Sequence, residues 1–197
     1  MVCADYYLPK DDDSKPGGDD SHFICAAKQT IATYGQLILH SLHRELMDGD
    51  PKEALEEVDP KRVLRDAFCV TESEGSSTAC VVSHKDGVLD AASIGYSRFM
   101  VFRKNKIVCR SLIQQRGFKL SLPVPVIEGD VVILRTDGFF DNMFESEVEE
   151  VLESRNRRII EGLYRWTAKL AGKKHKGGKI DDITVVIGKI VGSEFMF

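Results

Sequence analysis

Hydrophobic and polar positions change their period several times along the chain, and these changes predict where strands and helices begin. From Ser76 onward, short β-branched and aromatic runs predominate, namely STACVVSH, VLDAASIG, FMVFRK and KIVCRSL. Such runs, bounded by turn residues, are typical of strands. The first two are joined through Lys85-Asp86-Gly87 and the last two through Lys104-Asn105, both hairpin signals. The four runs therefore predict an antiparallel meander.

Three further segments have strand character. HFICAAKQTIA, residues 22–32, mixes apolar and β-branched residues and predicts a strand with a turn inside it. GDVVILRT supplies another strand, and DDITVVIGKIV predicts the last one.

Helical periodicity appears in three places. GQLILHSLHRELMDG, residues 35–49, has an apolar face and a glycine stop. A second helix is expected to begin at Asp59-Pro60, an N-cap residue followed by proline. Ser146 with Glu149 three residues later predicts a capping box for a third helical region. The apolar stripes expected for the three helices are Ile38, Leu39, Leu42 and Leu46; Val63, Leu64, Ala67 and Phe68; and Ile159, Leu163, Trp166 and Leu170.

The order of these elements predicts the fold class. Strands and helices come in blocks with many hairpin connections, which favours an α+β fold in which helices pack outside an antiparallel sheet or sandwich. With 197 residues, the chain is expected to form one domain, residues 1–197, in which the polar residues 1–21 are an extended arm.

Composition excludes several classes of function. The net charge of −4 argues against a surface that coats nucleic acid. No segment approaches the roughly 18 apolar residues of a membrane span, and no targeting segment is evident. The five cysteines form no C-x-x-C pair, so a zinc knuckle is not indicated. We expect a soluble intracellular protein, in the cytoplasm or nucleus, that is a monomer.

Acidic residues lie at the ends of three expected strands. Asp19-Asp20 precedes the first strand, Asp137 and Asp141 follow VVILRT, and Asp181-Asp182 opens the last strand. Carboxylates gathered at one end of a sheet repel one another unless a cation lies among them, and hard oxygen ligands suit Mg²⁺ or Mn²⁺. The alternative is that each pair only caps or turns the chain, as the Asp-Gly of RTDGFFDN commonly would.

Five segments together resemble a known family. GGDDSHFIC, GSSTACVV, LDAASIGYSRFMVFRKNKIVCRS, GDVVILRTDGFFDNMF and GGKIDDITVVIGKI follow the order of signature segments in the metal-dependent serine/threonine protein phosphatases of type 2C. The similarity is to their plant and mitochondrial branch and covers nearly the whole chain. It implies an α-β-β-α sandwich of two antiparallel sheets flanked by helices, with a two-metal site at one end.

The resemblance also implies roles for individual residues. Asp19 matches an acidic residue that holds the outer metal, and Asp20 matches the aspartate beside it. Asp137 and Asp181 match ligands of the inner metal, and Asp141 lies where some members bind a third ion. In this family, Mg²⁺ or Mn²⁺ activates a water that attacks phosphoserine or phosphothreonine of a phosphoprotein substrate.

The chain departs from the family pattern at three points. The family's Asp-Gly-x-Gly-Gly loop, whose aspartate bridges both metals, is missing, and no Asp or Glu occurs from Gln29 to Arg44. Tyr96 replaces an acid, and the segment between Gln115 and Pro123 is short. These departures leave three hypotheses: a phosphatase of impaired activity, a non-catalytic pseudophosphatase that binds phosphoproteins or regulators, or a truncated gene product with little stable fold.

Overall fold

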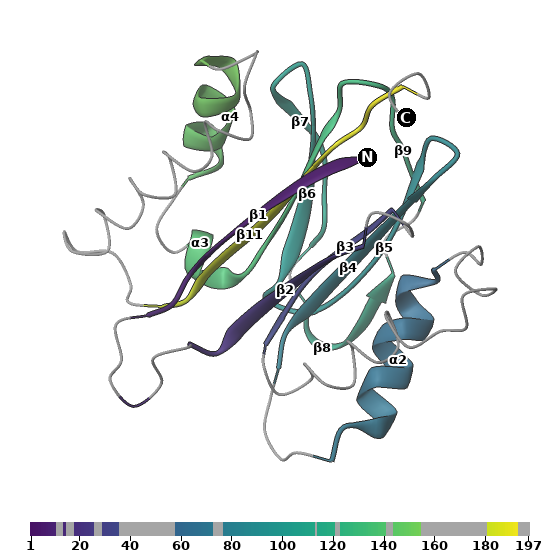
Figure 1. Cartoon of the computed structure of the whole chain (residues 1–197), viewed down its shortest axis with the longest axis vertical. Coiled ribbons are helices and arrows are strands. Elements are labelled where there is room, and N and C mark those ends of the chain that lie inside the picture. The colour runs from purple at the N-terminus through teal and green to yellow at the C-terminus, as the bar shows by residue number, and fades with distance from the viewer. Residues whose placement is uncertain are drawn as a thin grey trace.

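Two antiparallel sheets form the centre of the chain, with helices on their outer sides (Figure 1). The computed structural model describes residues 1–10, 14, 18–25, 29–35, 58–72, 77–112, 114–120, 123–140, 144–154 and 181–192. The first sheet has the strand order β1-β11-β10-β6-β7. Its strands are β1 (Val2–Leu8), β6 (Arg98–Arg103), β7 (Lys106–Arg110), β10 (Val131–Arg135) and β11 (Ile183–Lys189).

The second sheet has the order β2-β3-β4-β5-β8, and the short β9 also pairs with β5. Its strands are β2 (Asp20–Cys25), β3 (Thr30–Gly35), β4 (Ala79–Lys85), β5 (Val88–Gly95), β8 (Gln114–Leu120) and β9 (Val124–Pro125). The helices are α2 (Pro60–Val70), α3 (Asp137–Phe140) and α4 (Glu145–Ser154).

Three apolar layers hold these elements together. The layer between the sheets includes Ile31 and Val82 from one sheet and Val132 and Val186 from the other. A second layer joins the first sheet to α3 and α4, and a third joins the second sheet to α2. Because side chains alternate between the two faces of a strand, each sheet needs a partner on both sides. The predicted α-β-β-α sandwich is confirmed.

Local signals placed most elements correctly. Asp59 caps α2, since its carboxylate accepts the backbone N–H of Lys61 at 2.9 Å. Asp86 and Gly87 have φ of 48° and 77°, and Lys104 and Asn105 have φ of 49° and 65°. Positive φ at both central residues gives a turn that matches strand twist, so both hairpins formed as predicted.

Other local expectations were wrong. The two hairpins do not form one meander, because β4 and β5 lie in one sheet while β6 and β7 lie in the other. Phe68 is 64% exposed and does not join the buried stripe of α2. In α4 the capping contact comes from Glu147, which accepts the Phe144 N–H, whereas Glu149 accepts the N–H of Ile107 on β7. Tertiary contacts decided these positions.

The beginning of the chain also differs from the expected arm. Residues 2–8 form β1, an edge strand that pairs with β11 along its whole length, from Val2 opposite Lys189 to Leu8 opposite Ile183. The expected helix at 35–49 and the apolar face at 159–170 lie outside the described residues. Within the described part of the chain, no helix has the length and apolarity that crossing a membrane requires.

A partly buried ion pair gives a test of this fold. The Asp130 carboxylate, 1% exposed, accepts Nε and Nη2 of Arg103 at 3.0 and 2.8 Å and the N–H of Ile127 at 3.0 Å. Burial acts to raise the pKa of Asp130, but the Arg103 hydrogen bonds, the Ile127 N–H and the Arg103 charge outweigh it and lower the pKa. The carboxylate therefore stabilises the fold when ionised, and this contribution is lost as pH falls through its lowered pKa.

We expect Asp130→Asn to lower the free energy of unfolding at neutral pH by roughly 1–3 kcal/mol, the scale of a lost charged hydrogen bond. Denaturant melts should show this difference shrinking as the pH approaches the pKa from above. Asp66→Asn is the matched control, because Asp66 pairs with Arg65 on the surface of α2, where an ion pair contributes little. A loss no larger than that of the control would contradict the prediction.

Candidate functional site

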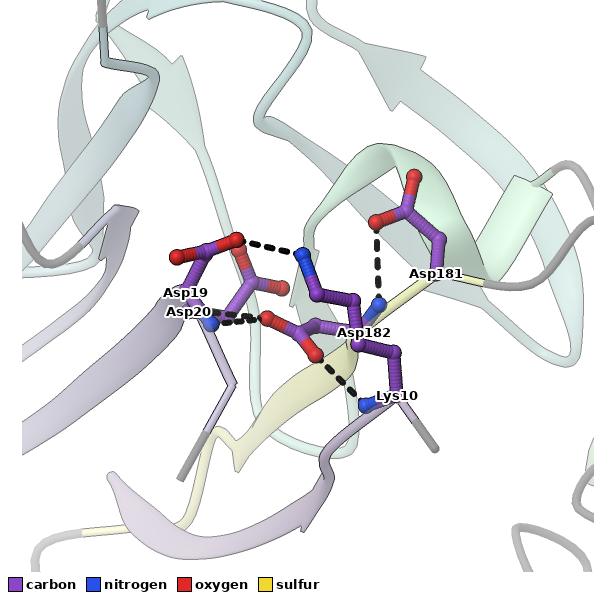
Figure 2. A network of polar contacts seen from close by, with 5 residues as sticks. All are labelled: Lys10, Asp19, Asp20, Asp181 and Asp182. Atoms are coloured by element: carbon purple, nitrogen blue, oxygen red, sulfur yellow. Dashed lines mark hydrogen bonds and ion pairs between the residues drawn. The ribbon is translucent and has the colours of Figure 1, made fainter. Parts of the chain in front are cut away.

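One buried carboxylate ties three segments together at one end of the sandwich. Asp182, 2% exposed, directly precedes β11. Its carboxylate accepts the backbone N–H of Lys10 at 2.6 Å, of Asp20 at 3.0 Å and of Asp19 (Figure 2). Lys10 lies just beyond β1, and Asp19 and Asp20 lie at the start of β2. Asp182 thus closes this end by joining one sheet to the other.

Two glycines allow the backbone to approach this carboxylate. A Cβ at Gly138 would lie 2.0 Å from the carbonyl oxygen of Asp182, and one at Gly18 would lie 2.6 Å from its Oδ1. Gly18 also has φ of +68°, a conformation that favours glycine. The Asp-Gly of RTDGFFDN therefore follows from close packing: Asp137 opens α3 after β10, and Gly138 lets α3 pack against Asp182.

Asp20 lies beside two other carboxylates. It accepts the Thr184 hydroxyl at 3.2 Å. Burial raises its pKa to about 7; hydrogen bonds from Thr136 and Thr184 act against this rise, while the charges of Asp182 and Asp137 add to it. Asp20 is therefore held in a poorly solvated position among like charges.

Asp19 has a different environment. The Lys10 ammonium lies 2.5 Å from Asp19 Oδ2, and the side chains of Lys10 and Asp19 are 23% and 46% exposed. Figure 2 shows that the Lys10 side chain turns back toward Asp19, while its backbone nitrogen is held by Asp182. Lys10 therefore supplies a positive charge to the acidic end of the sandwich.

A pair of aromatic rings borders these acids. Tyr7 on β1 and His22 on β2 have ring centroids 6.4 Å apart, and Asp5 Oδ2 lies 2.8 Å from His22 Nε2. Burial raises the pKa of Tyr7, and the charges of Asp182, Asp20 and Asp19 raise it further. The phenol is therefore neutral near the carboxylates.

The structure brings the four predicted site residues to this same end. The charge of Asp137 acts on Asp20, and the Cβ of Asp181 lies 3.1 Å from a Cβ built on Gly138. The Asp181 carboxylate accepts the N–H of Asp182 at 3.0 Å, and that of Asp137 accepts the N–H of Gly138 at 3.1 Å. Their role as metal ligands stays a prediction. The possible third-metal residue, Asp141, lies outside the described residues.

The donor set of this arrangement does not fit a two-metal centre. Among the residues that the structure describes, no three His, Cys, Asp or Glu side chains are placed to hold one metal ion together. Asp182 is occupied by backbone N–H groups, and Asp19 is paired with Lys10. On β3, the residues opposite Ser21 and Asp20 are Tyr34 and Gly35, so that strand offers no carboxylate beside Asp20.

Two tyrosines lie in segments where the chain departs from the family pattern. Tyr34 is 1% exposed and packs in the layer that contains α2, away from the acids. Tyr96, which stands where an acid was expected, is 40% exposed between β5 and β6. Neither tyrosine replaces a missing oxygen ligand within the described part.

Sequence reasoning named Asp182 only as part of an acidic pair, without a role of its own, and missed Lys10. Asp182 is in phase with Thr184 and Val186, which face the layer between the sheets, so period-2 alternation could have separated its role from that of Asp181. Lys10 had no comparable signal. It reaches the acids only because the preceding residues form a strand of the first sheet.

Known proteins with similar sequences are plant phosphatases. The probable protein phosphatase 2C 55 of Arabidopsis thaliana is 32% identical over 248 residues, covering 98% of this chain and 52% of the relative. The putative protein phosphatase 2C 23 of Oryza sativa subsp. japonica is 30% identical, covering 98% of this chain and 76% of the relative. The chain spans about half the length of the Arabidopsis relative. No protein-family model matches it.

Solved structures show the same fold. The photosystem II phosphatase PBCP has a TM-score of 0.80 with 21% identity, covering 96% of this chain and 98% of that chain. The catalytic domain of the serine/threonine protein phosphatase PstP, in complex with two manganese ions, has a TM-score of 0.72 with 17% identity and covers 97% and 98%. The alignments with both plant relatives are longer than the 197 residues of this chain, so these two relatives carry segments that this chain lacks.

The different roles of Asp182 and Asp181 can be tested by substitution. Asp182→Ala should leave three backbone donors without their acceptor, and each such loss costs roughly 1–3 kcal/mol. We therefore expect a large fall in melting temperature for Asp182→Ala and a smaller one for Asp181→Ala. Equal losses in thermal melts would show that Asp182 does not hold this end together.

The raised pKa of Asp20 predicts an unusual pH dependence. Between the ordinary value of 3.8 and about 7, the folded chain keeps a proton that the unfolded chain has released. Stability should therefore decline as pH rises through this range in the metal-free protein. Asp20→Asn should flatten the profile of melting temperature against pH, whereas Asp86→Asn, at the exposed turn after β4, should not. A profile that Asp20→Asn leaves unchanged would contradict the assignment.

Proposed function

The chain belongs to the type 2C family of protein phosphatases, and from this we propose that it is a hydrolase of phosphoserine and phosphothreonine in protein substrates, with impaired turnover. The observation that carries the proposal is the convergence of carboxylates from β2, α3 and the start of β11 at one end of the sandwich. Their hard oxygens favour Mg²⁺ or Mn²⁺ as the cofactor, and a structural relative was solved with two manganese ions.

We attribute the proposed impairment to two features of the metal-binding acids: a bridging acid is missing, and Asp19 is paired with a lysine. The segment from Gln29 to Arg44 contains no acidic residue to bridge two ions, and Lys10 is paired with Asp19. Each 1.36 kcal/mol of lost transition-state stabilisation lowers the rate about tenfold. Because weak ion binding reduces this stabilisation, we predict a turnover number far below that of ordinary relatives.

A second candidate is a non-catalytic domain that binds phosphoproteins or regulators through the retained fold. The observation that favours it is the absence, within the described residues, of a three-ligand metal set. Under either candidate, we propose that the chain acts as one domain and as a monomer, in the cytoplasm or nucleus. Its net charge of −4 supports a protein partner over nucleic acid.

Hydrolysis of a phosphothreonine peptide tests the choice between these candidates. We expect slow phosphate release that requires Mn²⁺ at about millimolar concentration, since few oxygen ligands remain to bind an ion. Asp137→Asn should abolish this activity, and p-nitrophenyl phosphate should give the same dependence. Phosphopeptide binding without any metal-dependent release would favour the non-catalytic domain.

A loop graft tests the cause of the impairment. Inserting a relative's Asp-Gly-containing loop between Thr30 and Arg44, after β3 ends at Gly35, should raise the turnover number steeply because it restores a bridging carboxylate. A graft with Asn in place of that aspartate is the matched control. If the unmodified chain already turns over phosphopeptides as fast as the grafted one, the missing ligand does not limit it.

A further inference from the structure

β7 lies at one edge of the first sheet and presents alternate side chains to solvent. Among the strands that the structure describes, it pairs only with β6. The exposed residues of β7 and its continuation lie two apart, and they are Lys106, Val108, Arg110 and Leu112. The side chains of Lys106 and Arg110 are 62% and 59% exposed, and Val108 and Leu112 are 50% and 59% exposed. These four residues, here called the β7 stripe, alternate bases with apolar side chains.

A β-bulge makes β7 a poor template for a further strand. Two residue steps on β7, from Ile107 to Cys109, face a single step on β6, so Val108 is an additional residue. The N–H of Ile107 is already bound by the Glu149 carboxylate of α4 at 3.2 Å. Bulges and covering side chains protect an edge from strand addition. A partner at this edge is therefore recognised by the side chains of the β7 stripe.

Three glutamates of α4 occupy the two bases of the β7 stripe. Arg110 Nη1 lies 2.8 Å from Glu145 Oε2. Lys106 Nζ lies 3.0 Å from Glu149 Oε2 and 3.5 Å from Glu153 Oε1. Both bases stay more than half exposed, and ion pairs of this kind contribute little to stability. Because α4 is held to the sheet by buried apolar side chains, its glutamates can release the bases while the helix stays in place.

The spacing of the bases favours an extended acidic chain over a helix. Lys106 and Arg110 are four residues apart on a strand, which is roughly 13 Å at the rise of a strand. Glu145 and Glu149 are four residues apart on a helix, which is only about 6 Å. Acids four residues apart in an extended peptide therefore match the two bases more closely than the glutamates of α4 do.

We propose that the β7 stripe binds an extended acidic segment of a protein partner, in which carboxylates four residues apart alternate with apolar side chains. The carboxylates pair with Lys106 and Arg110 in place of the α4 glutamates. The apolar side chains cover Val108 and Leu112, and removing these from water adds affinity that exposed ion pairs do not supply. The inference holds for both candidate functions, because none of the four residues belongs to the acidic end of the sandwich.

Fluorescence anisotropy of a labelled peptide, titrated with the purified full chain, tests the inference. In the peptide, Glu, Val, Glu and Leu occupy alternate positions with Thr between them; in the control peptide, of the same composition, the two Glu are adjacent. The Lys106→Gln/Arg110→Gln double variant should bind the first peptide about tenfold more weakly, the combined scale of two exposed ion pairs. The Lys61→Gln/Arg65→Gln double variant, on the exposed face of α2, removes the same charge and should bind as the unmodified chain does.

A further variant is expected to change the affinity in the opposite direction. Glu153→Gln removes one carboxylate that competes for Lys106 and should tighten binding about twofold. Thermal melts establish whether the Lys106→Gln/Arg110→Gln variant is folded, and if it is not, the Glu153→Gln result decides. Equal binding of the two peptides, undiminished binding by a folded double variant, or no measurable binding by the unmodified chain would each overturn the inference. Unchanged or weaker binding by Glu153→Gln would overturn it as well, because the glutamates of α4 would then not compete with the peptide.

Discussion

The closure of the sandwich depends on how a group of aspartates is kept together at one end. Asp182 is buried and accepts backbone N–H groups from the segments that follow β1 and precede β2. A carboxylate that accepts several backbone donors holds their segments together through charge-assisted hydrogen bonds. Burial raises the pKa of its neighbour Asp20, and the charges of Asp182 and Asp137 add to this rise, although Thr136 and Thr184 donate hydrogen bonds to it. The same cluster therefore contains one acid that stabilises the fold and one that strains it.

This division explains how the acidic end can keep its architecture although the segment from Gln29 to Arg44 contains no acidic residue. Asp182, Gly18 and Gly138 are required by close packing whether or not a metal ion is bound. Asp19 and Asp137 have fewer structural duties among the described contacts, and their carboxylates suit ligand chemistry. Residues needed for the architecture thus lie beside the acids that are predicted to bind metal, in the same short segments.

Much of the fold could be predicted because its signals are local. Alternating apolar positions marked the strands, and the Asp-Gly and Lys-Asn turns marked the hairpins. Which sheet each hairpin joins could not be read in this way, since β5 and β6 differ in sheet although only Tyr96 and Ser97 separate them. Phe68 was misjudged because periodicity says which residues share a helix face, while tertiary packing decides which of them are buried. Ser146 was misjudged because the helix already begins at Glu145 and the Glu149 carboxylate accepts a donor on β7.

Of the residues in this site, only the acidic ones could be predicted from the sequence. Asp19, Asp20, Asp137 and Asp181 stand next to apolar strands, and the strand order brings those ends together. Lys10 could not be inferred, because its meaning depends on the pairing of β1 with β11, which a polar N-terminal segment does not signal. Within the described part of the chain, the ammonium of Lys10 supplies positive charge to this end beside the aspartates. The balance of charge at this end is therefore a property of the sheet edge as well as of the aspartates.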